Sequence, residues 1–219
     1  MGSLCFFAAL AVAPEAIIGA LVPVFVLYYA GKDPHLLDNL KYPKGSKVLV
    51  NPVAIFAKIS PEPLWRIYLI ASLPILIIGI ANYVIVPLSI AVGRRPVILT
   101  TGMLAIIGGV WAGFTTTLSH HLGARALQAL GVGTVESLIP LILQDLVFIH
   151  YRNRAIAAVW CSQGIIIVSI GIFSPMIIAA TDWRWIYWIT ACPAVLAWIL
   201  MCFWVPDTRW RRTSAELSQ

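Results

Sequence analysis

Six long apolar runs, separated by polar segments, dominate the hydrophobic pattern of the chain. Each run approaches or exceeds the roughly 20 residues that an α-helix needs to cross the hydrocarbon core of a bilayer. The pattern therefore predicts an all-α integral membrane protein with six transmembrane helices. The predicted helices cover residues 4–29, 65–91, 97–118, 122–148, 155–180 and 183–205.

A long polar connection at residues 31–64 separates the first predicted helix, within residues 1–30, from the other five. It holds five prolines, and proline at this density argues against a regular domain. A stretch near residues 48–59 is expected to lie on the membrane surface. Residues 65–210 form the remaining helical unit, and residues 211–219 form a short tail.

The segment Val92-Gly93-Arg94-Arg95-Pro96 is predicted to be a five-residue basic hinge between two antiparallel helices. Arginine beside a helix end is retained in the cytoplasm more easily than it is translocated. This favours a cytoplasmic N-terminus and a cytoplasmic tail, and it places residues 31–64 outside the cytoplasm. Arg94 and Arg95 either pair with Asp145, which is expected at the same membrane face, or act only as positive anchors.

Composition supports the membrane assignment and excludes several other classes of protein. The chain is 60% hydrophobic and 11% charged, with a mean hydropathy of +0.90, which is typical of membrane proteins. Its net charge of +6 does not indicate nucleic-acid binding, because the basic residues lie in loops and at helix ends.

Metal and enzyme chemistry are not expected. The four cysteines lie inside apolar runs, without the spacing of a disulfide framework or a metal site. His120 and His121 invite a metal site, but only His35 and His150 could join them, from two distant loops. Nucleophile, phosphate-loop and dinucleotide motifs are absent from the sequence, so we expect neither an enzyme nor a cofactor.

The fourth predicted helix carries a stripe of polar residues. Arg125 and Glu136 are eleven residues apart, close to three helical turns, so they share one face of the helix. Gln128 lies on the same side and His121 lies just above it, whereas Asp145 lies on the opposite face, past a break expected at Pro140. Such groups are unfavourable in lipid. The stripe therefore either lines a cavity that handles protons or substrate, or clamps neighbouring helices together.

Three features of other helices complete the candidates. Glu15 is either a cavity carboxylate or a residue at a misplaced helix end. Gly109 and Gly113 form a small-residue face that allows close helix packing. Pro175, which follows Gly171, predicts a kink in the fifth helix.

Several of these motifs resemble the Major Facilitator Superfamily, and specifically its fungal drug:proton antiporter-like branch. Gly93-Arg94-Arg95-Pro96 resembles the end of the loop between helices 2 and 3, and Gly171 to Pro175 lies where the antiporter helix 5 motif falls. The remaining similar segments are Arg125-Ala126-Leu127-Gln128 with Gly131 and Gly133 in helix 4, and Trp183-Arg184-Trp185-Ile186-Tyr187 and Val205-Pro206-Asp207-Thr208-Arg209-Trp210 at the ends of helix 6. The sequence departs from the family pattern at Ile90, Ala129 and Ser174.

The resemblance implies a transporter that works by alternating access, with a cavity between two six-helix halves. Arg125 would be the proton-coupling or substrate-facing arginine. Gly93, Arg94 and Arg95 would form a cytoplasmic latch with Asp145. Gly171, Ser174 and Pro175 would form the kink of helix 5.

The predicted function is proton-coupled efflux of a small amphipathic or cationic molecule, by a protein of the plasma membrane whose N-terminal half is this chain. The predicted partners are the lipid bilayer, the small-molecule substrate, protons and a second six-helix half, and nucleic acid is not among them. The alternative is a truncated membrane protein that does not transport, or an assembly partner for another half.

Overall fold

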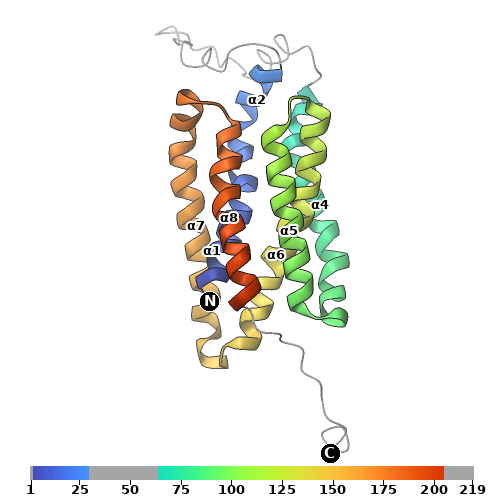
Figure 1. The fold of residues 1–219 in the computed structure, drawn as a ribbon, viewed down its shortest axis with the longest axis vertical. Helices are drawn as coiled ribbons and strands as arrows, with labels where there is room; N and C mark the ends of the chain where they lie inside the picture. The colour runs from blue at the N-terminus through green and yellow to red at the C-terminus, as the bar shows by residue number, and fades with distance from the viewer. Residues whose placement is uncertain (1, 30–63, 205–219) are drawn as a thin grey trace, which may run out of the picture.

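The computed structural model describes residues 2–29 and 64–204, and every regular element in these two ranges is a helix. Seven α-helices and one 3-10 turn make up the described part, and the long helices run up and down side by side (Figure 1). Their bounds are α1 Gly2–Ile18, η1 Gly19–Leu21, α2 Val22–Tyr29, α4 Leu64–Val92, α5 Arg94–Phe114, α6 Leu118–Leu146, α7 Ile149–Ala180 and α8 Arg184–Trp204.

Five of these helices, α4 to α8, are long and apolar enough to cross a membrane. The predicted first span differs, because it consists of two helices joined by the 3-10 turn η1. At about 1.5 Å per residue, the 17 residues of α1 extend roughly 26 Å, which is less than the hydrocarbon thickness. Pro23 lacks the N–H that would bond to the carbonyl of Gly19, so the helical pattern is interrupted at η1.

The connection between α4 and α5 is shorter than predicted. Gly93 alone separates the two helices, and Arg94 already begins α5. Gly93 has a φ of +119°, a conformation that L side chains rarely adopt. Pro96 lies in the first turn of α5, where a missing N–H leaves no helical bond unmade. The five-residue hinge of the prediction is therefore a single-residue turn.

The helix α1 lies at the centre of the packing and contacts α7, α8 and α6. On the other side, α6 packs along both α5 and α4. The helices α4 and α7 lie at the two flanks of the bundle (Figure 1) and leave most of their residues exposed. The turn between α4 and α5, which is Gly93, lies at one end of the bundle, called the Gly93 end, and the start of α8, which is Arg184, lies at the other, called the Arg184 end.

Glycines set the close approach of α5 to α6. A Cβ atom on Gly108 would lie 2.4 Å from the backbone nitrogen of Gln128, and one on Gly131 would lie 2.4 Å from the carbonyl oxygen of Thr101. Gly109, by contrast, faces only the Gln128 side-chain amide, and Gly113 faces Trp188 of α8. A small-residue face was correctly expected on this helix, but the tightest contact is at Gly108.

Two of the helices continue through an internal proline. The helix α6 runs continuously through Pro140, and α7 runs continuously through Pro175. The prediction of a break at Pro140 was therefore wrong. The predicted loop 31–64 lies outside the described residues except for Leu64, which begins α4. Its surface stretch 48–59 and the tail 211–219 also lie outside the described residues.

Candidate functional site

A charged pair links α1 to α6 in the interior of the bundle. Both terminal guanidinium nitrogens of Arg125 donate to Glu15: Nη1 to Oε1 at 2.8 Å and Nη2 to Oε2 at 2.6 Å. The Arg125 side chain is fully buried and the Glu15 side chain is 11% exposed. This two-pronged geometry is the strongest form of an arginine–carboxylate contact. Glu15 thus lies within the helical run 2–29 rather than at its end.

Gln128 extends the charged pair. It lies three residues after Arg125 on α6, a spacing that places two side chains on neighbouring turns. Its Oε1 accepts a hydrogen bond of 3.0 Å from Nη1 of Arg125. The Nε atom of Arg125 is buried and has no hydrogen-bond partner within the described residues. The Nε–H group of Arg125 is therefore a donor whose acceptor is not among the described residues.

Glu136 is on α6 as well, but the structure does not join it to the charged pair. It is half-buried, and it makes no hydrogen bond or ion pair with the part of the chain that the structure describes. Its neighbour Ser137 donates to Oδ1 of Asn82 on α4 at 2.9 Å. Of the predicted stripe, Arg125 is therefore in contact with Gln128 and with Glu15 of α1, while Glu136 lies apart.

The basic residues at the Gly93 end donate to carbonyl groups at the ends of helices. Arg94 donates to the carbonyl of Leu141 near the end of α6, at 2.7 Å, and Arg95 donates to that of Cys202 near the end of α8, at 2.9 Å. Arg152 of α7 donates to the carbonyl of Gln144, at 2.9 Å. Cations are favoured at helix C-termini, where carbonyls lack helical partners. The side chain of Asp145, the predicted partner of Arg94, lies outside the described residues.

The predicted kink element on α7 has a local hydrogen bond of its own. Pro175 cannot donate to the carbonyl of Gly171, four residues earlier. The hydroxyl of Ser174 donates to this carbonyl at 2.9 Å. Ser174 thereby satisfies the acceptor that the proline leaves free, and the helix stays continuous.

A buried histidine at the Arg184 end has partners that were not foreseen. His121 is fully buried; its Nδ1 lies 2.8 Å from the hydroxyl of Tyr29 on α2, and its Nε2 lies 2.9 Å from that of Tyr187 on α8. The imidazole stacks on Trp183, with ring centroids 5.1 Å apart. His121 thus joins three helices one turn away from Arg125. Its position above the polar stripe was evident from the sequence, but its partners on distant helices were not.

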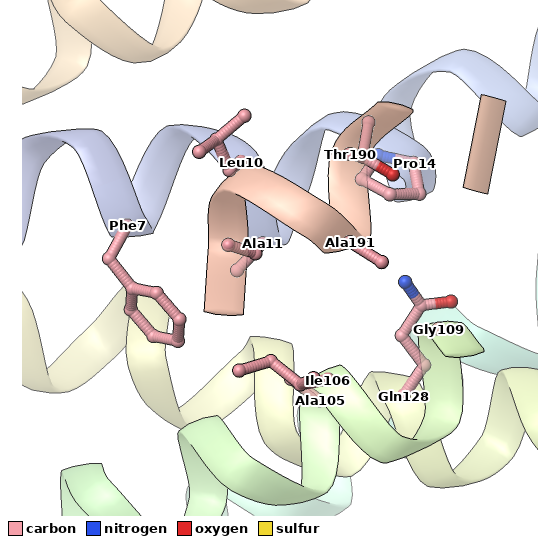
Figure 2. A pocket seen from close by; sticks show the side chains of 11 residues that line it. Phe7, Leu10, Ala11, Pro14, Ala105, Ile106, Gly109, Gln128, Thr190 and Ala191 are labelled. Carbon is pink, nitrogen blue, oxygen red and sulfur yellow. The ribbon is translucent and has the colours of Figure 1, made fainter. Parts of the chain in front are cut away.

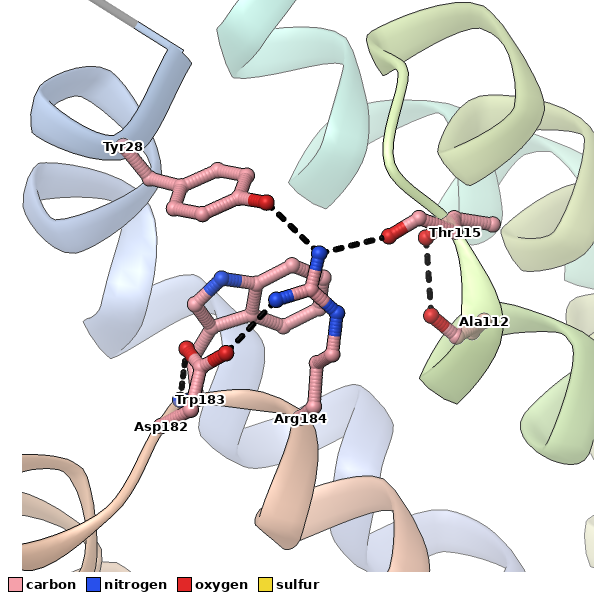
Figure 3. A network of polar contacts seen from close by, with 6 residues as sticks. All are labelled: Tyr28, Ala112, Thr115, Asp182, Trp183 and Arg184. Atoms are coloured by element: carbon pink, nitrogen blue, oxygen red, sulfur yellow. Dashed lines mark hydrogen bonds and ion pairs between the residues drawn. The ribbon is translucent and has the colours of Figure 1, made fainter. Parts of the chain in front are cut away.

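A second network surrounds Arg184 (Figure 3). Its Nη1 donates to Asp182 at 2.6 Å, and its Nη2 donates to the hydroxyl of Tyr28 at 2.6 Å and to the carbonyl of Thr115 at 3.0 Å. The guanidinium also lies over the rings of Tyr28 and Trp183, an arrangement that a planar cation favours. Arg184 belongs to the segment Trp183-Arg184-Trp185-Ile186-Tyr187 that resembles one end of the family's helix 6, and the structure shows that it ties this segment to α2 and to the α5–α6 turn.

The chemistry available in this interior is electrostatic. The described residues hold no group of three potential metal ligands. An apolar helical bundle with a buried ion pair across two of its helices is typical of membrane transport proteins, because intramembrane charges often mark pathways for ions and substrates.

Comparison with known proteins places this transporter fold in a family. A family model described as Major Facilitator Superfamily matches residues 4–216, and the chain belongs to that family. It is 29% identical over 131 residues to a transporter of Penicillium rubens, paaT, covering 59% of this chain and 24% of that protein. It is 25% identical over 123 residues to the arabinose-proton symporter of Escherichia coli K12, covering 56% of this chain and 26% of that protein.

The fold agrees with this membership. The structure superposes on the inward-open xylose transporter XylE of Escherichia coli with a TM-score of 0.69 and 16% sequence identity. The match covers 99% of this chain and 48% of XylE, so the chain spans about half the length of that transporter. Facilitator proteins are transporters, and the chain is accordingly a multi-pass integral membrane protein and not an enzyme.

Proposed function

We propose that the chain forms the N-terminal half of a proton-coupled transporter that exports a small amphipathic or cationic molecule. The observation that carries the proposal is the buried, two-pronged contact between Glu15 and Arg125. Two further features support it: the antiporter-like sequence motifs, and the relationship to a proton symporter.

The charged pair provides a way to couple a proton to a change of shape. Burying two charges is favourable only while each has its partner. A proton that binds the carboxylate of Glu15 turns it into a neutral acid and removes the charge–charge attraction to Arg125. Arg125 is then available to another acceptor, and the contact between α1 and α6 weakens. Because the pair joins two helices, its loss biases the bundle between two arrangements.

Charge also supports a cationic substrate. Glu15 and Arg125 neutralise each other, which leaves Glu136, on the same helix as Arg125, as an acidic group without an ion-pair partner among the described residues. An unbalanced intramembrane acid is most easily explained by a cation or proton that visits it. We therefore include Glu136, with Glu15, Arg125 and Gln128, in the substrate and proton cavity.

The Gly93 end is proposed to be the cytoplasmic latch. Arg94 and Arg95 bind helix ends in this structure, and Asp145 completes the proposed latch. Gly171, Ser174 and Pro175 form the proposed bending point of α7. A second six-helix half would complete the cavity, as two-repeat transporters require. The plasma membrane is the proposed location.

Ethidium efflux tests the coupling directly, because ethidium is an amphipathic cation. Cells or vesicles that contain the full transporter should extrude ethidium, and collapse of the proton gradient should stop the efflux. Glu15→Gln keeps the size of the side chain but cannot release a proton. We expect this variant to reach the membrane and to lose the response to the gradient. Efflux in Glu15→Gln that still follows the proton gradient would overturn the role of Glu15.

The alternative function is a membrane protein that does not transport, or an assembly partner for another half. An immunoblot of source membranes distinguishes the proposed transporter from this alternative. A band near twice the 24.0 kDa of this chain would favour the transporter, as two-repeat proteins require. A band near 24.0 kDa, together with normal insertion and no ethidium flux, would favour the alternative.

A further inference from the structure

A small pocket lies inside this half of the transporter, among α1, α5, α6 and α8 (Figure 2). Its volume is about 20 Å³, while a single water molecule requires roughly 10–15 Å³. The residues that matter for its chemistry are Phe7, Leu10, Pro14, Gly109, Gln128 and Thr190.

The amide of Gln128 supplies a hydrogen-bond donor to this pocket. The side chain is 96% buried, and its Oε1 is already occupied by Arg125. Its Nε2 carries two N–H groups, and neither makes a hydrogen bond within the described residues. Figure 2 shows this nitrogen directed into the space between α1 and α8. Gly109 leaves room there, since a Cβ at this position would lie 3.4 Å from Nε2.

The helix α1 supplies a matching acceptor. Pro14 has no N–H, so the carbonyl of Leu10, four residues earlier, loses its usual helical partner. Both residues line the pocket. The hydroxyl of Thr190 donates to the carbonyls of Ile186 and Tyr187, so its oxygen retains lone pairs that can accept. A buried donor and two acceptors thus belong to residues that line one space of the size of a water molecule, and such a water needs two to four polar partners.

We infer that this pocket is a binding site for one ordered water molecule, which bridges Nε2 of Gln128 to the carbonyl of Leu10. The water accepts a hydrogen bond from Gln128 and donates to Leu10, with Thr190 available for its second proton. The bound water also affects the contact between Arg125 and Gln128. Turning the amide by half a rotation would place its NH₂ group against the guanidinium of Arg125, donor against donor. The water favours the observed orientation, and Gln128 acts as a positioning residue for Arg125.

The water site itself does not depend on transport, although its effect on Arg125 rests on the proposed function. X-ray pulse radiolysis with mass spectrometry detects such a site, because a bound water gives hydroxyl radicals that oxidise the side chain beside it. The chain offers a matched internal control: Phe7 and Phe25 are both fully buried, but only Phe7 lines the pocket. In membranes that contain the full transporter, we expect Phe7 to be oxidised in millisecond exposures and Phe25 to remain unmodified. Equal labelling of the two would overturn the inference.

Two substitutions identify the amide as the group that holds the water. Gln128→Met keeps the length of the side chain and removes the donor, so the pocket becomes apolar and should stay dry. We expect the Phe7 label to be lost. Gln163→Met is the control, since Gln163 is equally buried but lies outside the pocket, donating to the carbonyl of Ala8 at 3.5 Å. It should leave the Phe7 label unchanged.

A third variant keeps the test decisive if Gln128→Met fails to reach the membrane. Ala191→Val fills the pocket from α8 and leaves Gln128 in place, and it too should abolish the Phe7 label. A Phe7 label that persists in either pocket variant would contradict the water site. These outcomes are independent of ethidium efflux, so a failure of the water site and a failure of proton coupling are distinguishable.

Discussion

Adding one methyl group at Gly108 should separate two helices and displace the charged pair. In Gly108→Ala, the new Cβ would lie 2.4 Å from the backbone nitrogen of Gln128 and 2.6 Å from its Cα. Real Cβ atoms keep at least 3.0 Å from such neighbours, so α5 and α6 must move apart by about 0.6 Å. Both contacts are with backbone, which cannot rotate away as a flexible side chain does.

The energetic effect follows from this overlap. Forcing extra atoms into a well-packed interface destabilises a protein by about 1–3 kcal/mol. For a domain of this size, each kcal/mol lowers the midpoint of thermal unfolding by roughly 2–4 °C. We therefore expect Gly108→Ala to lower that midpoint by about 2–12 °C. Arg125 should also be displaced, because Gln128 moves with the α6 backbone.

Thermal unfolding in detergent, followed by the loss of monodisperse protein in size-exclusion chromatography, measures this effect. Gly164→Ala on α7 is the matched control, since a Cβ there would meet nothing within 4 Å. It should leave stability unchanged or raise it, because alanine favours a helix over glycine by up to about 1 kcal/mol. If Gly108→Ala unfolds at the same temperature as Gly164→Ala, the close packing of α5 on α6 is refuted.

Three further substitutions test other parts of the bundle. Arg125→Met leaves the buried carboxylate of Glu15 uncompensated and should destabilise the protein by about 3–5 kcal/mol; in a double-mutant cycle by thermal unfolding, Glu15→Gln should recover part of this loss, and additive effects would argue against the pair. His121→Phe deprives the hydroxyls of Tyr29 and Tyr187 of their partner and should lower stability by about 1–3 kcal/mol for each hydroxyl left unsatisfied, whereas Tyr29→Phe should have a smaller effect because the contact with Tyr187 remains; equal stability of the two variants would contradict the network. Arg94→Ala removes a hydrogen bond to the end of α6 and should slow ethidium turnover with little change in apparent affinity, and unchanged turnover would count against the latch.

The helical architecture could be predicted from the sequence because hydrophobic length alone specifies a spanning helix. The predicted ends of α4, α7 and α8 lie within a few residues of the observed ones, except that α7 begins at Ile149 rather than at residue 155. The structure of the first span was harder to predict, because Gly19 and Pro23 interrupt a helix whose hydropathy is continuous. At Gly93, polarity suggested a loop, but arginine is a good helix former and Arg94 starts the next helix.

The candidate site could be predicted only in part. Helical spacing placed Arg125 and Gln128 on one face, and the structure puts them in contact. The contact of Arg125 with Glu15 joins residues 110 positions apart, and periodicity within one helix contains no information on which distant carboxylate lies opposite. For the same reason, the tyrosine partners of His121 could not be predicted from the sequence.

The spacing of glycines also misled for a physical reason. The pair Gly109 and Gly113 matches the interval of a packing face, yet Gly108 is the residue that meets the Gln128 backbone. Gly108, Gly109 and Gly113 are all buried. Because successive residues differ by 100° about the helix axis, only the positions of the neighbouring helices decide which of these glycines meets a backbone and which meets a side chain.

The most direct test of the central proposal is a measurement of protons moved with substrate. The full transporter would be reconstituted in liposomes that enclose a pH-sensitive dye, and ethidium would be added on one side. If Glu15 and Arg125 couple the two movements, ethidium should drive a proton flux in the wild type, and Glu15→Gln should abolish this flux while ethidium still moves down its own gradient. A Glu15→Gln variant that moves as many protons per ethidium as the wild type would contradict the account.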